Sequence, residues 1–199
     1  MLRFLLWFAG RIAKSCYQFQ WDLTEEFLKD PKGKIIAVNH QSSIDALFIW
    51  LMLDGRCSIV ASKEAIEKKN FLIRYLTRYF DIIYVSETSS TSATRTMISA
   101  LKSGKTILIF PEGRITTTGY LMPLESGTAF IAQKSGVNIY PVILDGLLSS
   151  RFAKVKDEHR ETVPRATADM RPVIEPDLYG TGKTQLENIN KVLALSLEY

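Results

Sequence analysis

The stretch KIIAVNHQSSIDALFIWLML, residues 34–53, joins two patterns that together indicate a fold unit. Residues 34–39 form an apolar run with the length of a buried strand, whereas residues 44–53 are apolar over the length of a helix. A short polar turn separates them. We therefore predict a strand that leads directly into a helix, with polar side chains held between the two.

The same alternation continues along the chain. Further strands are predicted at residues 57–61, 82–85, 106–110, 139–144 and 165–174, and helices at residues 63–79, 92–102, 126–134 and 185–197. Gly104 and Gly136 follow two of these helices as stop signals, and Pro172 favours an edge position for the last strand. This βαβα order predicts an α/β fold in which helices flank a largely parallel or mixed central sheet.

Size and charge limit the classes of protein that fit. A chain of 199 residues that is 46% hydrophobic and 23% charged suits one globular domain with a sizeable core. Its net charge of +4 favours an anionic membrane surface and is too small for a polybasic nucleic-acid footprint. Two cysteines and two histidines supply neither a disulfide framework nor a metal-ligand spacing, so we expect a metal-free site in a reducing cytoplasm.

The amino-terminal segment suggests contact with a membrane. Its first 13 residues are mostly apolar, but the run is interrupted by arginines and falls short of the ~20 residues that a spanning helix needs. On a helical wheel the polar residues gather in one sector, as in a helix lying in the headgroup layer: Arg3, Arg11, Lys14 and Gln18. We predict a membrane-associating helical segment at residues 1–30 and the α/β domain at residues 31–199. A signal segment and a helix packed on the core are the alternatives.

The polar turn between the first strand and its helix contains a candidate base. His40 follows the strand, and ligands of open α/β sheets bind outside the carboxyl ends of strands. Across such a turn Asp45 can accept the Nδ1 proton of His40, which leaves Nε2 to accept a proton from a substrate. In the alternative interpretation, Ser42 or Ser43 caps the helix, Asp45 serves its positive end, and His40 is an ordinary loop residue.

A second polar string, FPEGR at residues 110–114, follows the predicted strand 106–110. Gly113 allows the backbone to approach a bound group closely, and Arg114 can present a planar fork to phosphate oxygens. Glu112 beside a phosphate would need to pair with Arg114 or to bind a hydroxyl. The alternative is a plain turn with a surface arginine.

In this order, and about seventy residues apart, the two strings resemble the signatures of the glycerophospholipid acyltransferase family. These signatures are a histidine and an aspartate separated by four residues, followed later by Phe-Pro-Glu-Gly. Pro141 stands where the family has a later strand-borne proline, so the resemblance covers residues 35–146. It implies an α/β acyltransferase with a membrane-contacting amino-terminal helix. It also implies that His40 is the general base and Asp45 its orienting partner.

The resemblance also implies how substrates are held. Glu112, Gly113 and Arg114 would bind the acceptor headgroup, and an acyl thioester of coenzyme A or acyl carrier protein would be the co-substrate, with no cofactor, metal or acyl-enzyme. The enzyme would be peripheral or monotopic on the cytoplasmic face of the cell membrane. Its partners would be the lipid surface, the acceptor and the thioester carrier, and not nucleic acid.

The sequence also bears on which lysophospholipid is the acceptor. The string FPEGRITTTG at residues 110–119, with residues 132–136, looks closest to the acyltransferase domain of bacterial 2-acylglycerophosphoethanolamine acyltransferase. Lysophosphatidate acyltransferases usually carry Asp-Arg after the strand that corresponds to residues 82–85, where this chain has Ser86-Glu87. Because a phosphate monoester carries nearly two negative charges and a diester carries one, this departure favours lysophosphatidylethanolamine. Lysophosphatidate is the alternative acceptor.

Three other functions compete with acyl transfer. GTGKT at residues 180–184 imitates the end of a phosphate-binding loop, but Asp177 stands where the pattern needs glycine, and Thr184 with Glu187 fits a helix capping box better. A serine hydrolase would need a Gly-x-Ser-x-Gly string, and the chain has none. A non-catalytic membrane-lipid-binding module remains, and the effect of replacing His40 by alanine distinguishes it from an enzyme.

Overall fold

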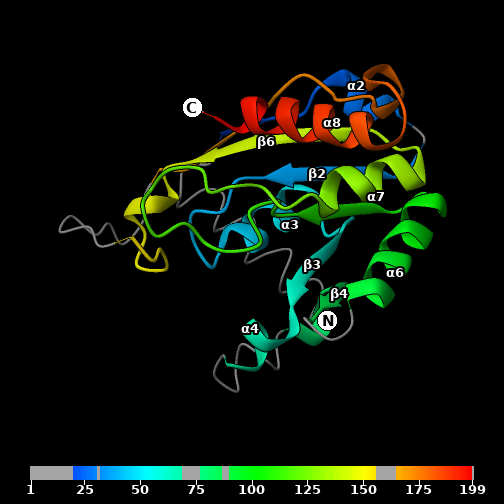
Figure 1. Ribbon diagram of the computed structural model, residues 1–199. Coiled ribbons are helices and arrows are strands. Elements are labelled where there is room, and N and C mark those ends of the chain that lie inside the picture. Colours follow the sequence, from blue (N-terminus) through cyan, green and yellow to red (C-terminus); the bar gives the residue numbers. More distant parts are fainter. Residues whose placement is uncertain (1–19, 31, 69–76, 87–89, 156–164, 199) are drawn as a thin grey trace.

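The computed structural model describes residues 20–30, 32–68, 77–86, 90–155 and 165–198. Within these ranges the strands form one sheet in the order β1-β7-β6-β2-β5-β3-β4 (Figure 1). The strands are Gln20–Asp22 (β1), Lys34–Val38 (β2), Ser58–Ser62 (β3), Ile82–Val85 (β4), Thr106–Ile109 (β5), Ile139–Asp145 (β6) and Thr167–Met170 (β7).

Most neighbouring strands run in the same direction. β2 is parallel to both β5 and β6, and β3 is parallel to both β5 and β4. β7 is antiparallel to β6 and parallel to β1, so the sheet is mixed. The predicted α/β class with a mixed central sheet is therefore confirmed. The carboxyl ends of β2, β5 and β6 meet at one edge, to which the β2 arrow points in Figure 1.

Helices connect and cover these strands. The α-helices are Glu25–Lys29 (α2), Asp45–Met52 (α3), Lys63–Glu67 (α4), Ser90–Lys102 (α6), Gly127–Ser135 (α7) and Gly182–Leu197 (α8). Three 3₁₀ turns lie among the described residues, at Thr77–Tyr79 (η1), Leu147–Ser149 (η2) and Pro176–Tyr179 (η3). In this part of the chain, no helix combines the length and the apolar character that crossing a membrane requires.

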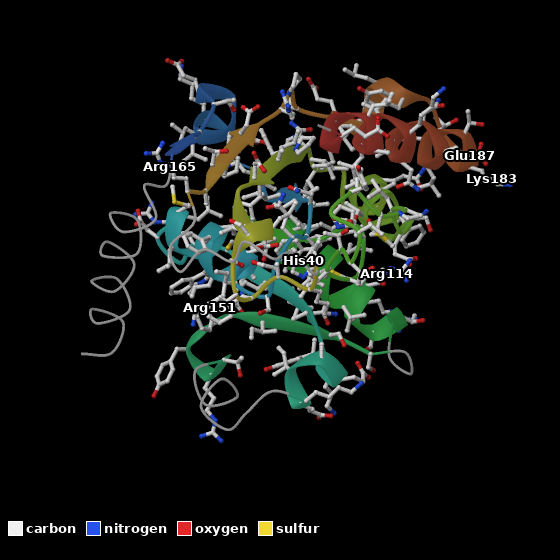
Figure 2. All side chains as sticks on the ribbon, turned by 90° about the vertical axis from the view of Figure 1, so that its left-hand side faces the viewer. His40, Arg114, Arg151, Arg165, Lys183 and Glu187 are labelled. Carbon is white, nitrogen blue, oxygen red and sulfur yellow. The ribbon has the colours of Figure 1, made fainter. Side chains whose placement is uncertain are left out.

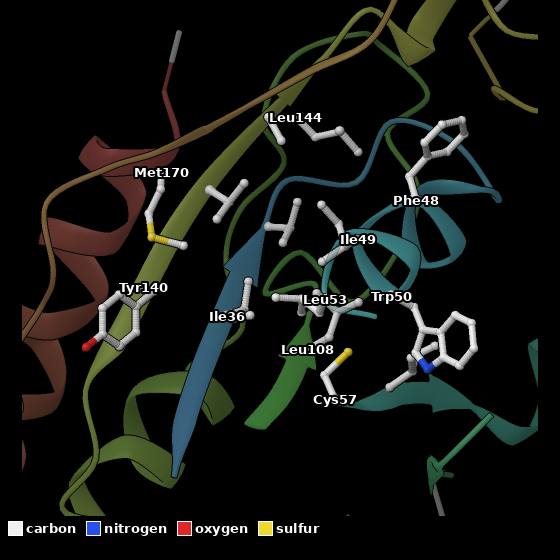
Figure 3. Packing of buried hydrophobic residues seen from close by; sticks show 14 of the residues in the cluster. Ile36, Phe48, Ile49, Trp50, Leu53, Cys57, Leu108, Tyr140, Leu144 and Met170 are labelled. Atoms are coloured by element: carbon white, nitrogen blue, oxygen red, sulfur yellow. The ribbon is translucent and has the colours of Figure 1, made fainter. Parts of the chain in front are cut away.

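Strand β2 is buried on both faces, as expected for a central parallel strand. Ile36 and Val38 pack in a cluster with α3, while Ile35 and Ala37 pack in a second cluster with α6, α7 and α8. Figure 3 shows the first cluster, in which Ile36 lies near Leu108 of β5. The apolar run at residues 34–39 thus forms the centre of the sheet, and side chains packed on both faces hold its carboxyl end in place.

The predicted elements are mostly present, with three corrections. The helix predicted at 63–79 is α4 followed by η1, and residues 69–76 lie outside the described residues. The last strand lies between β1 and β6 rather than at an edge, because β1 pairs with it. Thr184 lies inside α8 instead of capping it, and Glu187 pairs with Lys183 at 3.8 Å.

The predicted membrane-associating segment, residues 1–30, is described only in part. Residues 1–19, which include the polar sector of the expected helix, lie outside the described residues. Residues 20–22 form β1, which pairs in parallel with β7, and α2 follows it. The sheet domain therefore begins before residue 31. Sequence analysis missed β1 because three residues are too few to show an alternating pattern.

The buried thiol of Cys57 provides a test of the α3 side of the core. Burial, with a smaller contribution from the Asp81 charge, raises the pKa of Cys57 from 9.0 to about 12. In a Cys16→Ser variant at pH 8, we expect iodoacetamide to alkylate native Cys57 about 1,000-fold more slowly than an unfolded thiol, because the thiolate fraction falls tenfold per pKa unit. The folded protein holds the proton of the Cys57 thiol more tightly than the unfolded chain does. The protonated thiol therefore contributes fully to the stability of the fold below pH 9, and this contribution is lost as the pH rises toward 12. Rapid native labelling, measured by mass spectrometry, would contradict this packing.

Candidate active site

The turn that follows β2 is fastened to β6 and to η2 by buried amide side chains. Asn39 Nδ2 donates to the Leu144 carbonyl at 2.9 Å, and the Leu144 N–H donates to Asn39 Oδ1 at 2.6 Å. Gln41 Oε1 accepts the Leu147 N–H at 3.0 Å. These bonds extend the pairing of the two strands past their last residues. The backbone around His40 is therefore fixed before any substrate binds.

Asp45 collects four hydrogen bonds at the amino-terminal end of α3. Its side chain is fully buried, and Oδ2 lies 2.9 Å from His40 Nδ1. The same oxygen accepts the backbone N–H groups of Gln41 at 2.6 Å and Ser42 at 2.8 Å, and Oδ1 accepts the Ser42 hydroxyl. The predicted contact between His40 and Asp45 is thus present. Capping by Ser42 or Ser43 is wrong, because Ile44 occupies the N-cap position and makes no side-chain cap hydrogen bond, whereas Asp45 does lie in the first turn of the helix.

The imidazole of His40 is held by Phe110 and by Asp45. Its ring stacks on Phe110, the first residue of the second motif, with centroids 4.0 Å apart and an angle of 19° between the planes. Its side chain retains 17% of its exposure. With Nδ1 directed to Asp45, Nε2 is the nitrogen available to a substrate, and no residue in the described ranges hydrogen-bonds it.

Glu112 joins the two motifs through backbone groups. Its carboxylate is 2% exposed and accepts the His40 N–H at 2.7 Å and, through its other oxygen, the Met122 N–H at 2.7 Å. Burial raises the pKa of Glu112 above its usual range, against the opposing effect of these two hydrogen bonds. Sequence analysis predicted a contact with the acceptor, but both oxygens already serve the protein backbone. The described contacts therefore give Glu112 a positioning role, and its contact with the acceptor stays a prediction.

Gly113 and Arg114 lie on the exposed side of the same loop. Gly113 adopts a φ of 66°, a conformation that glycine accepts without strain, and its N–H donates to the Phe110 carbonyl at 3.0 Å. Arg114 is exposed and makes no ion pair with any described residue, so the expected pair with Glu112 is absent. Its guanidinium is left available for an anionic ligand.

Thr116 anchors this loop beside the base. Its N–H donates to the His40 carbonyl at 2.8 Å, and its hydroxyl donates to the Tyr120 carbonyl at 2.8 Å. The same hydroxyl oxygen accepts the N–H groups of Thr118 and Gly119. Thr116 is buried and organises the loop, which brings the backbone that carries Arg114 close to His40.

Among the described residues, the contacts around His40 include a base but no nucleophile. Ser42, the hydroxyl nearest in sequence, donates to Asp45 rather than to the imidazole. A histidine with one nitrogen fixed by a carboxylate and the other open can remove a proton from a hydroxyl of a bound substrate. Together with an exposed arginine on the adjoining loop, this arrangement suits the activation of an alcohol that carries an anionic group.

The role of Glu112 predicts a specific mutant phenotype. In Glu112→Gln the amide nitrogen cannot accept either N–H, so one of the two backbone donors loses its partner. We expect a loss of about 1–3 kcal/mol in the free energy of unfolding and a fall in kcat as His40 shifts. Urea denaturation and steady-state kinetics measure both. A rise in acceptor KM with unchanged stability and kcat would indicate that Glu112 contacts the substrate instead.

Comparison with known proteins identifies the type of domain. The Acyltransferase family model matches residues 22–145, which include both motifs and the sheet from β2 to β6. The chain also shares its fold with the crystal structure of the 1-acyl-sn-glycerophosphate (LPA) acyltransferase PlsC from Thermotoga maritima. That match has a TM-score of 0.71 and 20% sequence identity, and it covers 96% of this chain and 77% of the bacterial one.

Curated relatives agree with the family model. Human 1-acyl-sn-glycerol-3-phosphate acyltransferase beta is 26% identical over 156 residues, which are 75% of this chain and 55% of the human protein. The 1-acyl-sn-glycerol-3-phosphate acyltransferase of Limnanthes douglasii is 32% identical over 120 residues, 58% of this chain and 42% of the plant protein. The chain thus spans about half the length of these relatives. Since the family model covers more than half of the chain, this protein belongs to the acyltransferase family whose signatures its two motifs resemble.

Proposed function

We propose that this protein transfers a fatty acyl group from an acyl thioester to the free hydroxyl of lysophosphatidate, which yields phosphatidate. The observation that carries the proposal is the contact of His40 with buried Asp45, beside the loop of Arg114. The curated relatives reported above, which are named as 1-acyl-sn-glycerol-3-phosphate acyltransferases, support this acceptor. The donor is an acyl thioester of coenzyme A or of acyl carrier protein.

The reaction proceeds in one transfer. Nε2 of His40 takes the proton of the acceptor hydroxyl as that oxygen attacks the thioester carbonyl, and Asp45 stabilises the resulting imidazolium. The tetrahedral intermediate then collapses, the carbon–sulfur bond breaks, and the imidazolium returns the proton to the departing thiolate. Positioning of the two substrates supplies the remaining acceleration, with Gly113 and Arg114 binding the headgroup. No acyl-enzyme forms.

The site operates at a lipid surface in this proposal. Both the acceptor and the product are membrane lipids, and the segment at residues 1–19 has the sequence pattern of a helix lying in the headgroup layer. We therefore place the protein on the cytoplasmic face of the cell membrane, as a peripheral or monotopic enzyme, with the remainder of the chain as its catalytic domain.

Lysophosphatidylethanolamine is the second candidate acceptor. It is favoured by Ser86-Glu87 after β4, where a glutamate would oppose a doubly charged phosphate. Glu87 lies outside the described residues. The resemblance of residues 110–119 to 2-acylglycerophosphoethanolamine acyltransferase points in the same direction. The two acceptors differ by about one negative charge, so a direct competition between them decides the question.

The experiment is a matrix of acceptors and donors. Purified protein is assayed with lysophosphatidate, lysophosphatidylethanolamine and lysophosphatidylglycerol, each with an acyl-coenzyme A and an acyl carrier protein thioester. We expect the highest kcat/KM with lysophosphatidate. A clear preference for lysophosphatidylethanolamine would establish the second candidate. Absence of transfer with every pair, together with intact binding to vesicles, would establish a non-catalytic lipid-binding module.

A further inference from the structure

The segment that follows η2 lies against the turn that carries His40. The Ser43 N–H donates to the Phe152 carbonyl at 3.2 Å, and Ser42 forms an isolated antiparallel bridge with Ala153. The segment is braced internally, because Ser150 is buried and accepts the Phe152 N–H through its hydroxyl at 3.3 Å and the Ala153 N–H through its carbonyl at 3.1 Å. The position of this segment beside the base is therefore fixed by backbone contacts.

Two arginines consequently flank His40. Arg151 immediately precedes Phe152, whose carbonyl contacts the turn, and Arg114 precedes Thr116, whose N–H contacts His40. Figure 2 looks onto the edge where the strands end and shows Arg114 and Arg151 on opposite sides of His40. Both side chains are exposed, and neither forms an ion pair or hydrogen bond with any residue in the described ranges.

Two guanidinium groups that have no ion-pair partner among the described residues lie at the edge of His40, and this has a clear chemical consequence. A guanidinium presents two parallel N–H donors that match a pair of phosphate oxygens, and it stays charged at all physiological pH values. A phosphate monoester carries about −1.5 to −2 charges and three terminal oxygens, enough to engage two such forks. A phosphate diester carries one charge and two terminal oxygens, so it gains less from a second arginine.

We propose that Arg151 is a specificity-determining residue that binds the phosphate monoester of the acceptor together with Arg114. This inference rests on the proposed function, because it concerns the same site and the same class of acceptor. It explains how a site without a cationic residue at positions 86 and 87 distinguishes a monoester from a diester. The positive charge that distinguishes a phosphate monoester from a diester is supplied by Arg151 in the segment after β6, and not by the turn after β4.

The test compares Arg151→Ala with Arg56→Ala. Arg56 is a matched control, since it is also exposed and unpaired among the described residues but precedes β3 and so lies at the opposite edge of the sheet. A charged hydrogen bond contributes about 1.5–3 kcal/mol, so we expect Arg151→Ala to raise the KM for lysophosphatidate about 10- to 100-fold with kcat nearly unchanged. The KM for lysophosphatidylethanolamine should change less than about threefold, and Arg151→Lys should recover part of the loss. Melting temperatures verify that each variant is folded.

Competition by sn-glycerol 3-phosphate separates headgroup recognition from membrane adhesion, because this soluble monoester has no acyl chain. We expect it to inhibit the wild type and the Arg56 variant more strongly than the Arg151 variant. An equal loss with both acceptors that parallels weaker binding to anionic vesicles would assign Arg151 to membrane contact and overturn the proposal. Unchanged kinetics would also overturn it. If the wild type does not use lysophosphatidate, the proposed function fails, and binding of sn-glycerol 3-phosphate measured by calorimetry still tests Arg151.

Discussion

Replacing His40 by alanine is expected to lower kcat by about 10²- to 10⁴-fold, the contribution of a positioned general base. Without Nε2, the acceptor hydroxyl must lose its proton to solvent as it attacks the thioester. The bonds that fix this turn come from the His40 backbone, Asn39, Gln41 and Asp45, so the fold should persist. The measurement is steady-state acyl transfer, with circular dichroism as the test of folding.

The other histidine of the chain provides the control. His159→Ala removes an identical side chain, and we expect it to leave kcat within about twofold of the wild type, because His159 belongs to neither of the two motifs. Acceptor binding by the His40 variant should also be largely retained, because the arginines that we propose as phosphate ligands are untouched. Full activity of His40→Ala with either donor would remove the basis for the mechanism.

Replacing Asp45 by asparagine is expected to reduce kcat by up to about 10⁴-fold while the structure changes little. The amide oxygen of asparagine can keep the bonds that Oδ2 accepts, and its NH₂ can donate to Ser42, whose hydroxyl rotates to accept. The lost element is the negative charge that stabilises the imidazolium. The loss should therefore be found in kcat and not in acceptor KM.

Asp45→Ala separates this electrostatic effect from a structural one. It leaves the buried N–H groups of Gln41 and Ser42 without an acceptor, at a cost of about 1–3 kcal/mol for each group, so the free energy of unfolding should also fall. Equal activity of the asparagine and wild-type proteins would show that Asp45 is only a structural acceptor for this turn.

The parts of the fold that the sequence predicted are those with strong local patterns. Apolar runs predicted β2, β5 and β6, which are buried on both faces, and the polar interruption after β2 marked the site. The pairing of His40 with Asp45 was also predictable, because five residues across a strand-to-helix turn constrain two side chains to meet. These features depend on residues that are close together in the sequence, so the order of residues is enough to predict them.

The parts that sequence analysis missed depend on contacts between distant residues. The bond from the His40 N–H to Glu112 joins residues 72 apart, and the two bonds between Asn39 and Leu144 join residues 105 apart. A buried carboxylate that accepts backbone N–H groups has the same sequence signature as one that contacts a ligand, so the two backbone contacts of Glu112 could not be predicted. Arg151 gave no signal because it lies in a mixed-charge region, and only the contacts of Phe152 bring it to the site.

The most direct test of the central claim is nitrogen-15 NMR of the neutral form of the His40 imidazole in the 199-residue chain. The account predicts that the proton resides on Nδ1, where Asp45 accepts it, and that Nε2 is unprotonated and able to act as the base. Assignment of the His40 signals follows from their disappearance in His40→Ala. A proton found on Nε2, with Nδ1 unprotonated, would contradict the account.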